Sequence, residues 1–188
     1  MPPDFENEIE VKYAREFILP IAGLPLGSTE YTFDLGRKFF DLHADEEVVD
    51  SQVKVFLLVD KHENMIEFHF QIEGWLEVPC DRCADPYRQA VEGRQQLILK
   101  YGDTYEEESD EIIVIPADLH EFDVSHLIYE YVILMLPYRR IHPEDNQGVS
   151  ACNAEVLRRL EQLEATKKTD PRWDALKKLN DLSQTDEL

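Results

Sequence analysis

The sequence predicts an α+β fold, a curled antiparallel sheet that packs against one helix and is followed by a C-terminal helical tail. Three patterns predict it: apolar residues alternate over 53–75, recur at helical spacing over 124–135, and form an amphipathic stripe beyond residue 153. We therefore expect a mixed domain over residues 1–153 and a helical tail over 154–188.

The alternating segment is a predicted β-hairpin. Apolar residues occupy every second position of both arms (Val53, Val55, Leu57, Val59, Ile66, Phe68, Phe70 and Ile72). The turn falls at Lys61–Asn64, and the second arm continues to Cys80. A further strand follows Pro86, although its alternation is imperfect over 92–95. Only one face of the hairpin can be buried, so we expect these core residues: Val55, Leu57, Phe68 and Phe70.

The other elements are read from capping and spacing. Asp123 or Ser125 can cap a helix over Val124–Met135 that ends before Pro137. Residues 103–123 contain nine carboxylates and no lysine or arginine, which predicts a mobile acidic loop around a short strand at 112–115. Shorter elements are expected upstream, as strands at Glu8–Tyr13 and Tyr31–Phe33 and a short helix at Leu35–Leu42.

The predicted tail consists of two amphipathic segments. The first carries an apolar stripe of Val156, Leu157, Leu160 and Leu163. The second starts at Asp170-Pro171, an N-cap followed by the residue favoured at the first helical position, and places Trp173, Leu176 and Leu179 on one face. One interpretation of this tail is an oligomeric scaffold in which its apolar residues pack on a second copy.

The composition of the chain excludes some classes of function. Forty acidic and nineteen basic residues give a net charge of -21, which repels a phosphate backbone over most of the surface and suits a basic protein partner. The first residues have neither a basic start nor an apolar stretch, which indicates a cytoplasmic protein. No apolar run is long enough to cross a bilayer, so we expect no membrane partner.

The cysteines carry the main chemical clue. Cys80-Asp-Arg-Cys83 lies at a predicted hairpin tip, and His142 and Cys152 lie in a later turn-rich stretch. Three thiols and one imidazole match the number and type of ligands in a structural zinc site. We therefore expect a metal site, with zinc as the cofactor, formed by Cys80, Cys83, His142 and Cys152.

Two other interpretations of the cysteines remain open. The three thiols can be reduced, buried, small apolar groups, with His142 on the surface. The CxxC can also be the centre of a thiol-disulfide oxidoreductase. Such a motif usually opens a helix after a strand, whereas this one meets Asp85-Pro86 and leaves Cys152 unexplained.

Four arginines flank the predicted ligands: Arg82, Arg88, Arg139 and Arg140. A guanidinium group matches both phosphates and carboxylates. These arginines are therefore candidates for RNA or partner contact, or for local salt bridges to carboxylates nearby. A weaker carboxylate and imidazole site can be drawn from His120, Glu121, Asp123 and His126. The common nucleotide, hydrolase and metalloprotease motifs are absent, so we expect no enzyme.

These features occur in a familiar order. The Cys80-Asp-Arg-Cys83 knuckle after a strand, the acidic stretch, the helix that ends in Leu136-Pro137, and Cys152 together resemble the YceD-like family. The resemblance covers roughly Glu8–Asn153, and Asp170-Pro-Arg-Trp173 is similar to one branch. Many members carry a cysteine where this chain has His142.

The resemblance implies a non-enzymatic factor in the accumulation or processing of large-subunit ribosomal RNA and in ribosome assembly. The implied partners are a basic large-subunit ribosomal protein or pre-ribosomal RNA. The zinc is an inference from the residues and not from the resemblance. The oligomeric state is left open.

Overall fold

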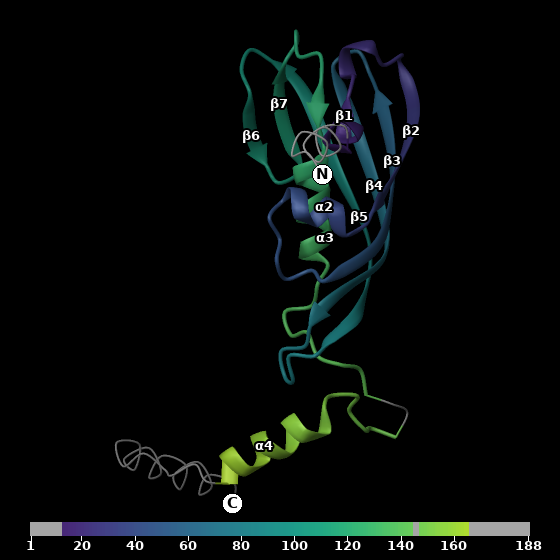
Figure 1. The fold of residues 1–188 in the computed structure, drawn as a ribbon. Helices are drawn as coiled ribbons and strands as arrows, with labels where there is room; N and C mark the ends of the chain where they lie inside the picture. Colours follow the sequence, from purple (N-terminus) through teal and green to yellow (C-terminus); the bar gives the residue numbers. More distant parts are fainter. Residues whose placement is uncertain (1–12, 145–146, 166–188) are drawn as a thin grey trace, which may run out of the picture.

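The computed structural model describes residues 13–144 and 147–165, and its largest element is a six-stranded sheet of order β2-β3-β4-β5-β7-β6 (Figure 1). The strands are β2 Gly27–Leu35, β3 Asp50–Lys61, β4 Met65–Pro79, β5 Pro86–Gly102, β6 Glu106–Ser109 and β7 Ile112–Pro116. A second sheet pairs β1 Ile18–Leu19 with β8 Phe122–Asp123.

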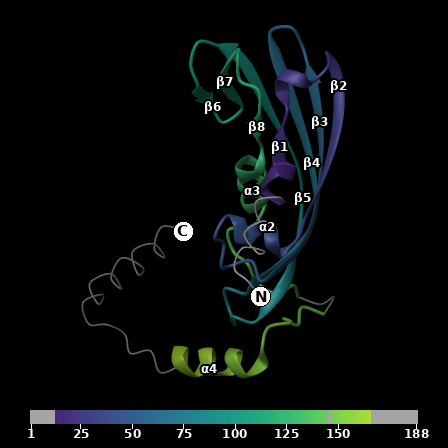
Figure 2. The ribbon, with the colours of Figure 1, turned by 45° about the horizontal axis from the view of Figure 1, so that its top comes forward.

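The helices α2 Arg37–Leu42 and α3 Ser125–Leu134 and the small sheet cover one face of the large sheet. A further α-helix is α4 Ala154–Ala165, and two short 3-10 helices are η1 Arg15–Phe17 and η2 Ile21–Gly23. Figures 1 and 2 both show α2, α3 and the β1–β8 pair on the same side of the strands. α3 packs there through Ile128, Tyr131 and Val132, which are buried. The fold is therefore mixed α+β, mostly strand.

The long hairpin follows the alternation of the sequence. β3 and β4 pair antiparallel, with Lys61 opposite Ile66, and the intervening turn is closed by a hydrogen bond from the His62 backbone N–H to the Met65 carbonyl. All four predicted core residues of this hairpin are at most 2% exposed. The hairpin, its turn and its buried face are thus confirmed.

β5 is one continuous strand through the segment of imperfect alternation. Its inward positions in that segment are Gly93 and Gln95, so the period of two continues without apolar residues. A side chain at Gly93 would displace the end of Met135, because a Cβ placed there would lie 2.5 Å from the Met135 Cε atom. The end of α3 therefore fills the space that an apolar residue would occupy.

Two sequence expectations for this sheet are wrong. The sheet is not purely antiparallel, because β7 pairs in parallel with β5. The acidic segment expected as a mobile loop contains β6, which pairs antiparallel with β7. β7 is hydrogen-bonded on both sides because it lies between β5 and β6. The residues of β6 are exposed at the sheet edge, where Glu108 pairs with Lys100 at 2.9 Å. The curl expected for the sheet stays a prediction.

The remaining elements agree in position with the expected ones. The helices α2 and α3 lie within the ranges expected for them, and β7 covers the expected strand. α4 coincides with the first tail segment, whereas the second segment from Asp170 lies outside the described residues, as does nearly all of the expected strand Glu8–Tyr13. The division between residues 153 and 154 stays a prediction.

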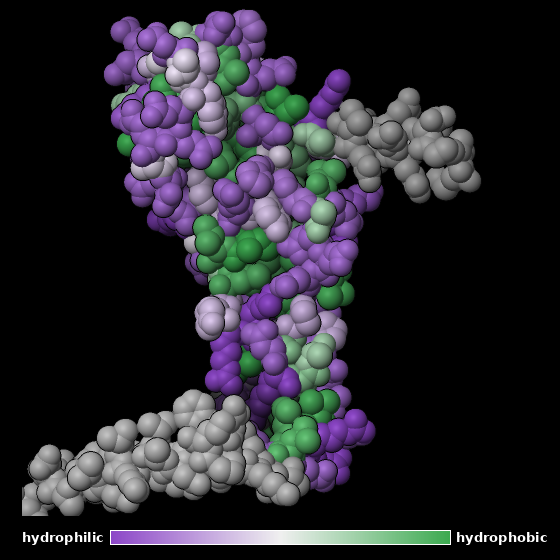
Figure 3. Space-filling view, turned by 90° about the vertical axis from the view of Figure 1, so that its left-hand side faces the viewer, coloured by the Kyte–Doolittle hydropathy of each residue, from purple (hydrophilic) through white to green (hydrophobic). Residues whose placement is uncertain are grey.

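One long side of the molecule is mainly hydrophilic (Figure 3). Figure 3 shows one long side of the molecule, where polar residues dominate and apolar residues gather about half-way along its length. None of the described helices has the length and apolar character needed to span a membrane.

Candidate metal centre

The turn between β4 and β5 forms the first half of the candidate site. It is closed by hydrogen bonds from the Cys80 N–H to the Asp85 carbonyl (3.0 Å) and from the Ala84 N–H to the Cys80 carbonyl (2.8 Å). Ala84 takes a left-handed backbone conformation with φ 63°. This tight turn directs both thiols of the CxxC to the same side.

The second half of the site returns along the chain after α3. The Asp81 N–H donates to the Arg140 carbonyl (2.7 Å), and the Arg140 N–H donates to the Asp81 Oδ2 atom (2.6 Å). The Arg140 guanidinium also lies 3.6 Å from Asp81 and 2.6 Å from Glu47. These contacts hold the segment after Pro137 against the turn and place His142 beside it.

The structure brings together all four residues that the sequence analysis selected as ligands. The three sulfurs and one imidazole nitrogen lie within 4.8 Å of one another. The Sγ atoms of Cys80 and Cys152 are 3.8 Å apart, and Cys83 Sγ lies 3.5 Å from His142 Nδ1. All three thiols are buried. This group could hold a metal ion.

Two of the distances match the edges of a tetrahedral metal site. Zinc bonds of about 2.3 Å to sulfur and about 2.0 Å to nitrogen, at tetrahedral angles, give edges of roughly 3.8 Å between sulfurs and roughly 3.5 Å between sulfur and nitrogen. The Cys80–Cys152 and Cys83–His142 spacings agree with these edges. The four atoms lie within 4.8 Å of one another, so the longer spacings must shorten by up to about 1 Å for one ion to touch all four.

The cluster favours one thiolate. Burial raises the pKa of the Cys80 thiol, but hydrogen bonds from the backbone of Arg82, Cys83 and His142 and from the His142 ring outweigh it, lowering the pKa to about 6. Burial raises the pKa of Cys83, and the neighbouring Cys80 and Cys152 sulfurs raise it further. Backbone hydrogen bonds from Asn153 and Asp85 lower the pKa of Cys83 without offsetting these effects, so Cys80 ionises more readily than Cys83.

Two neighbours of the site were not found from the sequence. The ring of Tyr87 lies 5.0 Å from that of His142 and covers it. Asn153 accepts a hydrogen bond from the Glu155 N–H at the start of α4 and donates another to the Asp85 carboxylate. The signal for Asn153 was available, because asparagine directly before an amphipathic helical segment is a favoured N-cap.

The four arginines have different environments. Arg140 is engaged by Glu47 and Asp81, and the Arg88 guanidinium lies 4.0 Å from the centre of the Trp75 ring. Arg82 and Arg139 are exposed. The structure therefore separates one arginine that holds the fold together from others that face solvent.

The alternative carboxylate and imidazole set is not brought together. Within the part of the chain that the structure describes, the group at the knuckle is the one set of three or more potential ligands that converges. His126 instead pairs with Glu130 one helical turn later, at 3.2 Å.

The comparisons with known proteins identify a family. The family model for the large ribosomal RNA subunit accumulation protein YceD matches residues 68–180, more than half of the chain. The match starts later than the expected Glu8 and runs past Asn153 to include Asp170-Pro-Arg-Trp173. No curated protein and no solved structure gives a significant match. The chain belongs to the YceD family of large ribosomal RNA subunit accumulation proteins.

Proposed function

We propose that this chain is a cytoplasmic, non-enzymatic factor in the accumulation and processing of large-subunit ribosomal RNA, with one structural zinc ion at its knuckle. The family supports the first part, because its description names an accumulation factor and no reaction. The convergence of four soft ligand atoms carries the second part. The proposed partners are pre-ribosomal RNA or a basic large-subunit protein.

Zinc is the metal that this donor set favours. Thiolate and imidazole ligands in a closed tetrahedral arrangement are typical of structural zinc, and carboxylates are absent from the group. Three thiolates around a divalent ion leave one negative charge. The hydrogen bond from the Arg82 N–H to Cys80 Sγ (3.4 Å) would offset part of that charge. The proposed ligands are Cys80, Cys83, His142 and Cys152.

The proposed zinc has a structural role. Its ligands come from the β4–β5 turn and from the segment after Pro137, which approach each other only in the folded chain. Metal binding to such a site adds its free energy to folding. The ion would therefore stabilise the junction from which α4 begins.

Metal analysis of the purified full-length protein tests the zinc proposal. We expect about one zinc per chain, loss of the metal and a lower melting temperature in Cys83→Ser, and smaller effects of the same kind in Cys152→Ser and His142→Ala, where water can replace the ligand. His126→Ala is the matched control, an exposed histidine outside the group. Unchanged metal content in Cys83→Ser would end the proposal.

Cells that lack the chain test the ribosomal role. We expect a reduced ratio of large-subunit to small-subunit ribosomal RNA, and co-sedimentation of the protein with precursors of the large subunit. An unchanged ratio together with no co-sedimentation would contradict the role. Alkylation of the native protein separates this proposal from thiol-disulfide chemistry, since metal-bound thiolates react slowly and a low-pKa redox cysteine reacts quickly.

A further inference from the structure

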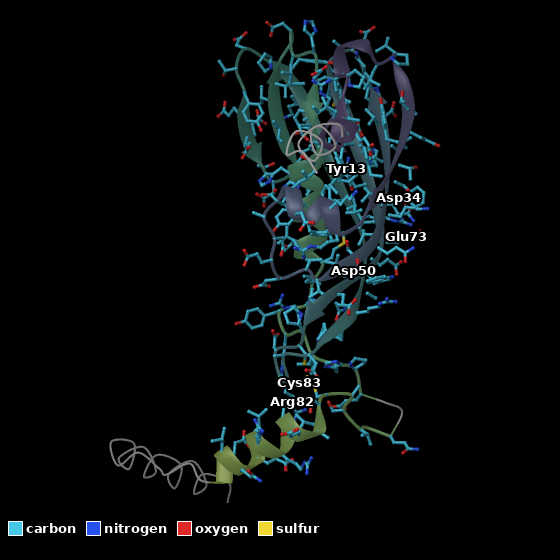
Figure 4. All side chains as sticks on the ribbon, in the orientation of Figure 1. Tyr13, Asp34, Asp50, Glu73, Arg82 and Cys83 are labelled. Carbon is cyan, nitrogen blue, oxygen red and sulfur yellow. The ribbon has the colours of Figure 1, made fainter. Side chains whose placement is uncertain are left out.

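The end of the molecule that carries the Cys80–Cys83 turn is called the knuckle end. Two arginines there, Arg82 and Arg139, have no carboxylate partner among the described residues. The neighbours Asp81 and Arg140 are hydrogen-bonded to each other, so Arg82 and Arg139, which follow and precede them, belong to the same end of the molecule. Figure 4 shows Arg82 beside Cys83 at this end, close to the start of α4. Tyr138, next to Arg139, is fully exposed.

The charge of the chain is distributed unevenly. Residues 80–88 and 137–159 contain six arginines and five carboxylates, whereas the rest of the chain contains thirteen basic and thirty-five acidic residues. Several of the carboxylates at this end are also engaged, Asp81 by Arg140, Asp85 by Asn153 and Glu155 by Arg159. The knuckle end is thus close to neutral in a strongly acidic protein.

The most acidic segment lies far from this end. β5 starts beside the knuckle at Pro86 and ends at Gly102, where the acidic residues 103–111 begin, and Figure 1 shows the two regions at opposite ends. A strand of 17 residues spans up to about 55 Å. The Debye length at physiological salt is about 8 Å, so the acidic segment does not repel an anion at the knuckle.

We propose that the knuckle end contacts single-stranded RNA, with Arg82 and Arg139 at phosphates and Tyr138 stacked on an unpaired base. This inference rests on the proposed function and names the surface that would carry it. Guanidinium groups match phosphates, and an exposed aromatic ring stacks on any base. A basic protein segment would be repelled by these arginines, which favours RNA over such a partner at this surface.

Binding of a short fluorescein-labelled single-stranded RNA to the full-length, metal-loaded protein tests the proposal by fluorescence anisotropy over a range of salt concentrations. We expect Arg82→Ala/Arg139→Ala to weaken binding and to flatten the slope of log affinity against log salt by about 1.4, since each phosphate contact contributes about 0.7. We expect Tyr138→Ala to weaken binding at least about fivefold, the effect of losing one stacked base.

Matched controls come from elsewhere on the surface. Arg94 on β5 and Tyr105 near β6 are exposed, and their alanine variants should bind as the native chain does. No binding by the native protein at low salt, or equal losses in the control variants, would overturn the inference. So would a native-like affinity and salt slope in Arg82→Ala/Arg139→Ala. Co-sedimentation retained by a chain that binds no RNA would leave the proposed function standing and remove only this surface.

Discussion

Ala84 is a non-glycine residue held in the left-handed region at the knuckle turn. That conformation costs a residue with a Cβ about 1 kcal/mol or more. Ala84→Gly should therefore raise the free energy of unfolding by up to about 1 kcal/mol, measured by denaturant titration. The control is Ala90→Gly, at an exposed position on β5, which should lower that free energy by about 0.5–1 kcal/mol. A loss of stability in both variants would show that the backbone of Ala84 is not strained.

The environment of His43 predicts that the stability of the protein depends on pH. Burial lowers its pKa, and the nearby His126 lowers it further, against the opposing effect of Asp123 and Asp45. Its ring stacks on Tyr129 at 4.5 Å, and its buried Nε2 atom has no hydrogen-bond partner within residues 13–144 and 147–165. The unfolded chain therefore binds a proton on this residue more readily than the folded protein does.

The free energy of unfolding should consequently fall as the pH decreases through the ordinary histidine pKa of about 6.5. His43→Phe retains the ring and removes the titration, so its stability should change less between neutral and mildly acidic pH than that of the native chain. Thermal unfolding of both proteins across this pH range provides the comparison. Parallel pH profiles would show that His43 does not contribute.

At the scale of elements, Gly74 controls how closely β3 approaches β4. It has φ 150°, and a Cβ there would lie 2.2 Å from the Gln52 carbonyl oxygen. Gly74→Ala should cost at least about 2 kcal/mol of stability, because backbone must move. Gly93→Ala should cost less, since the atom it meets is the flexible end of Met135. Equal losses in the two variants, measured by chemical denaturation, would refute this distinction.

The elements that the sequence predicted well are those governed by local periodicity. The β3–β4 hairpin and α3 carry their apolar pattern in consecutive residues, and the pattern alone fixes the buried face. The insertion of β7 between β5 and β6 depends on a pairing between strands, and local alternation holds no information on pairing partners. Local charge likewise favoured a loop where β6 gains its hydrogen bonds from β7.

In the candidate site, too, some features follow from the residues themselves and others depend on the path of the chain. Ligand chemistry selected Cys80, Cys83, His142 and Cys152 because the residue types are rare and suited to one ion. The reciprocal hydrogen bonds between Asp81 and Arg140 could not be predicted, since both residue types are common and their meeting depends on the path of the chain after α3.

At the scale of the whole molecule, the knuckle connects the sheet to α4. Asn153 contacts both Asp85 in the turn and the first turn of α4. Removal of the proposed zinc by a chelator should therefore increase amide hydrogen exchange in 80–86 and 147–157, and leave exchange in β3 and the facing part of β4 unchanged. Uniform acceleration throughout the sheet would instead indicate that the metal supports the entire domain.

The ligands lie far apart along the chain, so a bound ion would restrict the chain before it folds. His142 lies 59 positions after Cys83, so an ion that holds both residues converts the segment between them into a closed ring that includes β5, β6, β7 and α3. A covalent cross-link around a loop of this length removes chain entropy equivalent to about 4 kcal/mol at 25 °C. In a denatured chain that kept its metal, the central strands would remain tethered, and refolding would begin with Cys83 and His142 already joined.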